Sequence, residues 1–219
     1  DRFADLVDAL RRLRQAGIIR TNFKLQNTYR MLMERERLPL VTSSDEAALA
    51  PEWLAELKRE HGLGEWNGLG ALYCWSEEQL RAEEAIVRRE LEPLVDAIVF
   101  LDQPILDDEA ALRDRIAADT GYDISRLRDH YFDHTRMLGN VTGKGVHGAY
   151  WRMPAVAPSG QAYDETDLDT DHVGFIWVDP IVPFRGQDMV EAAALASEVQ
   201  QRHGFEPNLG FNCVTERAT

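Results

Sequence analysis

The chain has 219 residues, of which 44% are hydrophobic and 28% charged, and its formal net charge at pH 7 is −14. A chain of this length can bury one good core or two small ones, and its mixed composition argues against global disorder. The negative charge argues against a nucleic-acid partner, because the phosphates would repel it. No stretch is long and apolar enough to span a bilayer, so we expect no membrane partner and a soluble protein of the cytoplasm or the periplasm.

Cys74 and Cys213 lie far apart in the sequence, each within an apolar stretch. We therefore expect two buried thiols rather than a disulfide or a metal pair. The chain begins at Asp1 without a methionine. We interpret it as a fragment or a processed form, in which a missing signal peptide proves little.

The first third of the chain is predicted to be mainly helical. Apolar residues recur at helical spacing over 2–16, and Gly17 ends this helix. The stretch 18–33 stays open between strand and helix. A further helix is expected over 51–61, because its proline suits a first helical turn.

The middle of the chain is predicted to form a strand, a helix and a strand. The first strand covers 66–75, with the sequence WNGLGALYCW. Ser76 and Gln79 then form a capping-box pattern at the start of a helix that ends near Leu91. The second strand covers 97–101.

The C-terminal stretch repeats this order. Aromatic and β-branched residues over 173–181 predict a strand, which prolines end. A helix begins at Gly186 and closes at His203, followed by a glycine suited to a left-handed cap. The last strand is predicted over 205–214.

Two such units indicate an α+β fold with a mostly antiparallel sheet, helices on one face and a duplicated, ferredoxin-like arrangement. Between the units, 107–119 is predicted to be a helix whose many charges mark an exposed face. The stretch 139–171, rich in glycine, proline and acidic residues, is predicted to be a functional or disordered loop.

Several motifs that carry chemistry elsewhere are incomplete here. The glycine-lysine run at 139–145 lacks the Ser or Thr of a phosphate loop. His130 and His134 have a metal-ligand spacing, but no third ligand is evident, and we favour two surface histidines over a metal site. The acidic run over 164–171 could bind calcium or form a solvated loop. The residues alone provide no complete acid–base or nucleophile set, and we predict no metal.

The aromatic residues are the stronger signal. Phe175 and Trp177 alternate with aliphatic residues and so share one face of a strand, and Tyr150 and Trp151 lie in the loop upstream. Such a set suits a pocket for a flat, apolar, hydroxylated ligand, although ordinary core packing would produce the same pattern.

Several longer motifs resemble those of the vanillyl-alcohol oxidase and 4-cresol dehydrogenase family. They are GLGEWNGLGALY (62–73), IWVDPI (176–181) followed by Arg185-Gly186, RHGF (202–205), and the opening helix RFADLVDALRRLRQAGII. The resemblance covers most of the chain and is weakest between Pro104 and Asp171.

The resemblance implies a single cap domain over 1–219, the substrate-binding part of a larger FAD-linked oxidase whose FAD-binding domain is not in this chain. The full-length enzyme would oxidise para-substituted phenols or aromatic alcohols by hydride transfer to FAD, and the cap alone would be inactive. The electron acceptor would be oxygen or a cytochrome c. We also expect a homo-oligomer.

The resemblance also implies roles for individual residues. Trp177 matches an aromatic position that lines the substrate pocket near the flavin, and we group Phe175 and Trp151 with it as substrate-binding. Tyr150 resembles the tyrosine to which 4-cresol dehydrogenases attach FAD covalently. The flavin-carrying histidine of the oxidases falls at Phe175, and a dehydrogenase glutamate falls at Gly210. The alternative is a non-catalytic α+β module for small-ligand binding or dimerisation that uses the same aromatic face.

Overall fold

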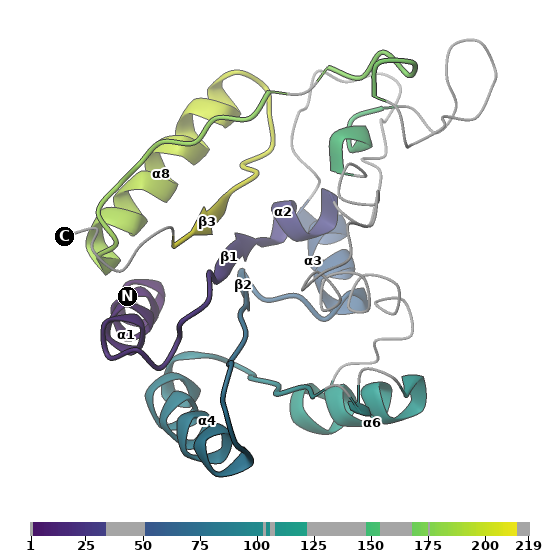
Figure 1. The fold of residues 1–219 in the computed structure, drawn as a ribbon. Coiled ribbons are helices and arrows are strands. Elements are labelled where there is room, and N and C mark those ends of the chain that lie inside the picture. The colour runs from purple at the N-terminus through teal and green to yellow at the C-terminus, as the bar shows by residue number, and fades with distance from the viewer. Residues whose placement is uncertain are drawn as a thin grey trace.

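The computed structural model describes residues 2–33, 51–102, 104–105, 108–121, 148–153, 168–174 and 176–213. Within them a three-stranded antiparallel sheet forms the centre, with β1 (Lys24–Asn27) between β2 (Trp66–Leu69) and β3 (Gly210–Asn212) (Figure 1). Helices surround this sheet, so the predicted α+β class is confirmed.

The helices agree closely with the sequence pattern. Their bounds are α1 (Arg2–Gln15), α2 (Thr28–Met33), α3 (Pro51–Glu60), α4 (Glu77–Leu91), the short 3-10 helix η1 (Glu92–Leu94), α6 (Glu109–Thr120) and α8 (Gly186–Arg202). The Oγ of Ser76 accepts a hydrogen bond from the backbone N–H of Gln79 at 3.2 Å, so the predicted cap of α4 is confirmed. Gln79 in turn accepts from the backbone N–H of Trp75, one residue earlier than in a regular capping box.

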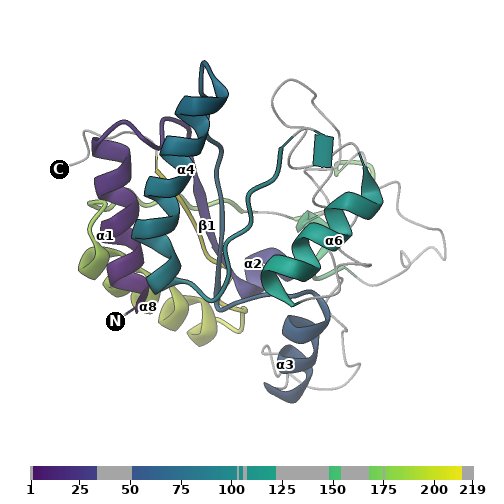
Figure 2. The ribbon, with the colours of Figure 1, turned by 90° about the horizontal axis from the view of Figure 1, so that it is seen from below.

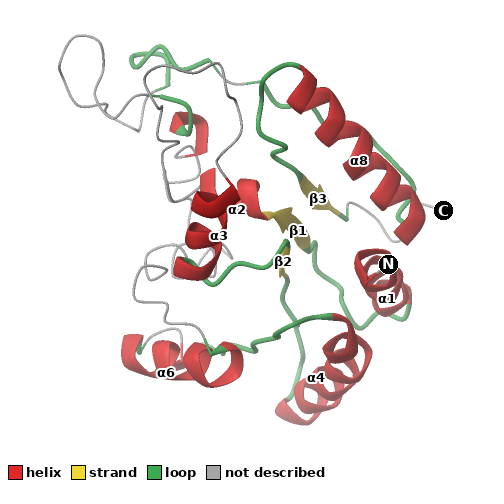
Figure 3. Cartoon of the chain, turned by 180° about the vertical axis from the view of Figure 1, so that it is seen from behind, coloured by secondary structure: helices red, strands yellow, loops and turns green. Residues whose placement is uncertain are grey.

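The main core lies between the sheet and three helices. Its buried residues come from α1, α4, α8, β1, the segment between α1 and β1, and the residues just before α8 and after β3; they are Val7, Ala9, Leu10, Leu13, Ile19, Phe23, Leu25, Val87, Leu91, Phe184, Met189 and Cys213. Figures 1 and 3 show α1 between α4 and α8, and Figure 2 shows α1 beside α4. Phe3 of α1 stacks on Trp66 of β2 with ring centroids 4.3 Å apart, which fixes the helix against the sheet.

A second core joins α2 and α3. Leu32 and Met33 of α2 pack with Leu57 and Leu63, and Trp151 completes the cluster. Tertiary packing therefore explains why so short a helix as α2 forms.

Two predicted strands are not strands in the structure. Residues 97–102 form no strand, and the apolar side chains over 98–101 alternate between two clusters. Ile98 and Phe100 pack against the main core, whereas Val99 and Leu101 pack with Leu112 and Ile116 of α6. The segment makes apolar contacts with helices on both sides. Its sequence therefore has the pattern of a buried strand, although it pairs with no other strand among the described residues.

The second exception is the predicted strand over 173–181, whose described residues form no strand. Ile176, Val178 and Ile181 are 86%, 76% and 97% exposed, so the apolar pattern reflects an uncovered surface. The strands predicted over 66–75 and 205–214 shorten to β2 and β3. Each predicted strand–helix–strand unit thus contributes one strand to the sheet.

Both cysteines are free thiols, Cys213 buried and Cys74 partly buried. Among the residues that the structure covers, no helix is both long and apolar enough to cross a membrane. The motifs at His130, His134, 139–145 and 164–167 lie outside the described residues.

Candidate functional site

The two faces of the sheet differ in character. Leu25 lies opposite both Gly68 and Phe211, and these residues face the main core. The alternate residues form the opposite face, which we call the polar face; they are Lys24, Gln26, Asn67, Leu69, Gly210 and Asn212. The three strands contain no acidic residue, although the chain carries 38 Asp and Glu residues, so none of the side chains that the strands contribute to the polar face is negatively charged.

Asn27 couples the sheet to α2. Its Oδ1 accepts hydrogen bonds from the backbone N–H groups of Arg30, at 3.0 Å, and Leu209, at 3.2 Å, while its Nδ2 donates to the carbonyl of Pro207. One side chain therefore caps α2 and fixes the approach to β3. This arrangement places Arg30 beside the polar face, where its Cγ is 3.8 Å from the position that a Cβ of Gly210 would occupy.

Arg30 also contacts Trp177, the aromatic residue for which we predict a pocket role. The guanidinium carbon lies 5.0 Å from the centroid of the Trp177 ring, a cation–π arrangement. Trp177 is 52% exposed, and its Nε1 donates to the carboxylate of Asp179. The ring is therefore held on one side by Arg30 and remains accessible to a ligand.

Tyr150, the predicted flavin-binding residue, is only 1% exposed. Its hydroxyl donates a 2.7 Å hydrogen bond to Asp171 Oδ2. A covalent bond from this oxygen to a flavin would require the residues around Tyr150 to move and this hydrogen bond to open.

Trp151 is 5% exposed and packs in the α2–α3 core. Its indole Nε1 donates to Glu206 at 3.2 Å, and Arg152 donates to both carboxylate oxygens of Glu206, at 2.7 and 3.0 Å. The charge of Glu206 also acts on Tyr29. Burial is the main cause that raises the pKa of the Tyr29 hydroxyl, and the negative charges of Glu206 and Glu65 raise it further. Trp151 is thus part of a buried polar network in this structure.

A second polar cluster, which the sequence did not indicate, joins α4 to the residues after α1. Arg20 donates to both oxygens of Glu83, at 2.9 and 2.8 Å, and the thiol of Cys74 lies 3.2 Å from the same carboxylate. Burial alone would raise the pKa of Glu83, but hydrogen bonds from Gln79, Cys74 and Arg20 outweigh it and lower that pKa. Burial and the hydrogen bond to Glu83 raise the pKa of Cys74, so its thiol stays protonated and poorly nucleophilic.

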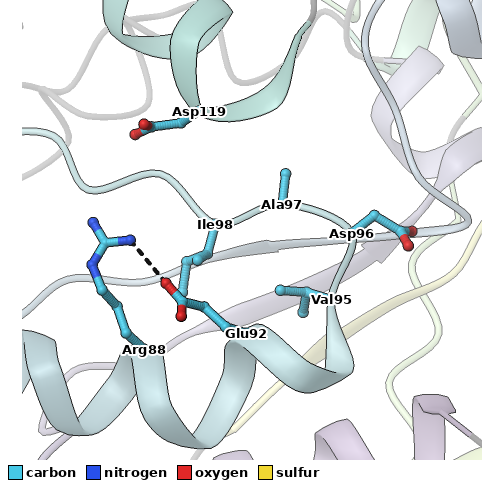
Figure 4. A pocket seen from close by; sticks show the side chains of 7 residues that line it. All are labelled: Arg88, Glu92, Val95, Asp96, Ala97, Ile98 and Asp119. Carbon is cyan, nitrogen blue, oxygen red and sulfur yellow. Dashed lines mark hydrogen bonds and ion pairs between the residues drawn. The ribbon is translucent and has the colours of Figure 1, made fainter.

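One small pocket, of about 220 Å³, lies where α4 and η1 approach α6 (Figure 4). Its lining residues are Arg88, Glu92, Val95, Asp96, Ala97, Ile98 and Asp119. Arg88 donates to Glu92 at 3.1 Å, and the lining contains no aromatic residue. Its size and acidic lining do not suit a phenol.

The predicted site residues belong to different contacts in the structure. Trp177 lies on Arg30, while Trp151 and Tyr150 belong to other contacts, and Phe175 lies outside the described residues. Sequence reasoning missed Arg30, because the stretch 18–33 could not be assigned to a strand or a helix, and its position depends on that assignment.

Comparison with known proteins agrees with this architecture, although no family model matches the chain. The fold places the chain among α+β domains built on an antiparallel sheet. In particular, it is the fold of part of p-cresol methylhydroxylase, whose substrate-bound crystal structure matches 99% of this chain with a TM-score of 0.56 and 17% sequence identity. The resemblance to the vanillyl-alcohol oxidase and 4-cresol dehydrogenase family is thereby confirmed at the level of the fold.

A curated protein is more similar in sequence. The 1'-carboxy-chondrochloren decarboxylase of Chondromyces crocatus is 31% identical over 212 residues, which is 97% of this chain. The chain spans only 38% of that protein and 37% of the p-cresol methylhydroxylase chain. Both matched proteins are enzymes.

Proposed function

We propose that residues 1–219 are the cap domain of a larger FAD-dependent oxidoreductase that oxidises para-substituted phenols or aromatic alcohols. The observation that carries this proposal is the match of nearly the whole chain to about a third of p-cresol methylhydroxylase. A match of that extent is what a single domain of a larger enzyme would give. The motifs shared with the family support the same assignment.

The described residues are better suited to cover one side of a flavin than to form a complete flavin-binding site. They offer an accessible indole at Trp177 and a sheet face without acidic residues, both compatible with a flat ring system. In this proposal another domain binds most of the FAD. When bound, FAD would supply the chemistry of hydride acceptance.

The chain's own residues would then bind and orient the substrate. The product of hydride loss from a phenolic benzylic carbon is a flat, electrophilic quinone methide. Trp177 would exclude water from one side of such a ring, and polar groups beside it would stabilise negative charge on the ligand. A cytochrome c or oxygen as the electron acceptor, and a homo-oligomeric assembly, belong to this proposal as well.

A second candidate substrate class follows from the curated relative. Its name describes a decarboxylase acting on a carboxylated compound, and its sequence identity to this chain is higher than that of the structural neighbour. We therefore include phenols that carry a carboxylate among the candidate substrates. A non-catalytic ligand-binding or dimerisation module remains the alternative from a different functional class.

The proposal is tested on the complete protein that contains this chain. We expect the purified protein to show a flavin absorbance spectrum, and the flavin to be bleached anaerobically by p-cresol, vanillyl alcohol or 4-hydroxyphenylacetate. Bleaching by any one of them supports the proposal. A protein that never binds FAD, or a flavin that none of these phenols reduces, contradicts it.

A further inference from the structure

We infer that a β-strand from the part of the complete protein outside residues 1–219 pairs with β3 and runs antiparallel to it, with residues 176–178 on its other side. The inference goes beyond the proposed function and rests on it only for the statement that this chain is one domain of a larger protein. It assigns an interaction surface, the outward-facing backbone of Gly210 and Asn212, which we call the open edge. The partner that fits this surface is an extended peptide strand.

The first argument is the direction of the backbone groups in β3. The N–H of Asn27 in β1 donates to the carbonyl of Leu209 at 3.0 Å. Backbone groups alternate in direction along an antiparallel strand, so those of Gly210 and Asn212 point away from β1. Both residues are exposed, and β3 lies at the edge of the described sheet. The open edge is therefore a template to which another strand can add its hydrogen bonds.

The second argument is a matching unused edge at residues 176–178. Ile176 and Val178 are 86% and 76% exposed, and neither makes a hydrogen bond within the part of the chain that the structure describes. Residues two apart in an extended strand direct their backbone groups to the same side. One added strand could therefore pair with β3 on one side and with this segment on the other. It would explain both why 173–181 forms no strand here and why the strand predicted over 205–214 shortens to β3.

The third argument is the direction of the segment that contains Trp177. Trp177 contacts Arg30, whose Cγ lies 3.8 Å from the Cβ position of Gly210, the first residue of β3. Further along, the Phe184 ring lies 5.5 Å from that of Phe23, whose carbonyl accepts a hydrogen bond from the residue just after β3. The segment thus runs parallel to β3, and α8 connects the two (Figure 1). In ferredoxin-like folds such a unit holds an antiparallel strand between its two parallel strands.

The small extent of the open edge argues for a strand of the same polypeptide rather than a second copy of the chain. β3 has three residues and is therefore about 10 Å long. A contact of this length falls well short of the roughly 800 Å² that each partner buries in a stable complex. A tethered strand needs less contact, because the tether raises its effective concentration. The chain spans 38% and 37% of the two matched proteins, so a protein of their length has residues to supply the strand.

The test is hydrogen–deuterium exchange of the complete protein, resolved to single amides by mass spectrometry with electron-transfer fragmentation. We expect the amides of Gly210 and Asn212 to exchange about as slowly as that of Phe211, which faces β1. We also expect slow exchange at Ile176 and Val178. If the edge were open in the complete protein, Phe211 would exchange more slowly than its two neighbours by about tenfold or more.

A matched pair of variants at Asn212 identifies the added strand. Asn212→Pro removes the outward N–H without removing a bond to β1, whereas Asn212→Ala keeps that N–H. We expect Asn212→Pro to speed exchange by about tenfold or more at Ile176, at Val178 and in one segment outside 1–219, which is then the added strand. Asn212→Ala is expected to match the wild type. If Asn212→Pro does not fold, the exchange pattern of the wild-type protein decides by itself.

Three results would overturn the inference. The first is fast exchange at Gly210 and Asn212 in the wild-type protein. The second is protection of these amides that disappears on dilution, because the partner would then be a second copy. The third is a response to Asn212→Pro confined to residues 1–219, because the strand would then belong to this chain. The measurement needs neither FAD nor substrate, so a colourless protein with a protected open edge would retain this inference and lose the proposed function.

Discussion

Arg152 and Glu206 form a forked ion pair across 54 residues of sequence, and it joins residues 148–153 to the loop between α8 and β3. The carboxylate is 3% exposed and accepts both hydrogen bonds from the guanidinium, while Arg152 also lies over the ring of Phe205. Breaking the pair would leave a buried polar group without its partner.

We therefore expect Glu206→Ala to lower the free energy of unfolding by about 1–3 kcal/mol, below the value for a fully buried pair because Arg152 is 37% exposed. Urea unfolding followed by circular dichroism measures this change. Glu198→Ala removes an ion pair in which both partners are 63% exposed, and we expect it to cost less than about 0.5 kcal/mol. Equal effects of the two variants would contradict the role of Glu206.

Gly186 makes a different kind of contact, in which the start of α8 touches the backbone of α1. A Cβ at this position would lie 2.2 Å from the carbonyl oxygen of Ala4, and backbone atoms cannot rotate away. We expect Gly186→Ala to destabilise the protein by about 1–3 kcal/mol, as overpacking does. Gly174→Ala is the control, because a Cβ there meets no atom within 4 Å. A melting temperature unchanged in Gly186→Ala would show that the two helices can separate without cost.

Glu83 gives the fold a predictable response to acid. Its pKa is lowered in the folded state from the ordinary 4.5. Its contribution to stability is therefore present above about pH 4.5 and is lost as the pH falls through the lower, folded pKa. We expect Glu83→Gln to flatten the pH dependence of the unfolding free energy in this acid range. Glu77→Gln, at an exposed pair on the same helix, controls for the loss of one charge. An acid response of Glu83→Gln identical to that of the wild type would rule out this role.

Substitutions of Trp177 and Trp66 are expected to distinguish a role in binding from a role in stability. Trp66 stacks between Phe3 and Phe211, so we expect Trp66→Ala to cost about 2–4 kcal/mol in unfolding free energy. Trp177 is half exposed, so Trp177→Ala is expected to cost at most about 1 kcal/mol, mainly from its contact with Arg30. In the complete protein the same variant is expected to raise KM for a phenolic substrate at least several-fold. Unchanged kinetics in a folded Trp177→Ala protein would remove Trp177 from the substrate site.

Tyr150 remains the predicted covalent anchor of the flavin. In the complete protein we expect the denatured wild-type chain to fluoresce on a gel, the Tyr150→Phe chain to lose that fluorescence, and a Tyr29→Phe control to keep it. Flavin fluorescence that stays with the denatured Tyr150→Phe chain would show that another residue carries the bond. A wild-type chain without fluorescence would show that no such bond forms.

Sequence patterns predicted the helices well because their signals are local. The periodicity of α1, the Ser76 cap of α4 and the positive φ of Gly204 after α8 each depend on a few neighbouring residues. The strands depend on partners elsewhere, and the pattern at 97–101 is the same whether its side chains meet a sheet or two helical clusters. Local alternation therefore cannot decide pairing.

The candidate site was predictable only in part, for the same reason. An exposed aromatic residue at 177 follows from composition and family motifs, but its neighbour Arg30 comes from the other end of the chain. That contact depends on β1 passing directly into α2 beside β3, a tertiary relationship that no local motif records.

Because no residue separates β1 from α2, the central strand sets where α2 begins. The side-chain oxygen of Asn27 accepts hydrogen bonds from the backbone of both Arg30 and Leu209, so the first turn of α2 and the approach to β3 share one anchor. An insertion between residues 27 and 28 would therefore disturb the sheet and α2 together.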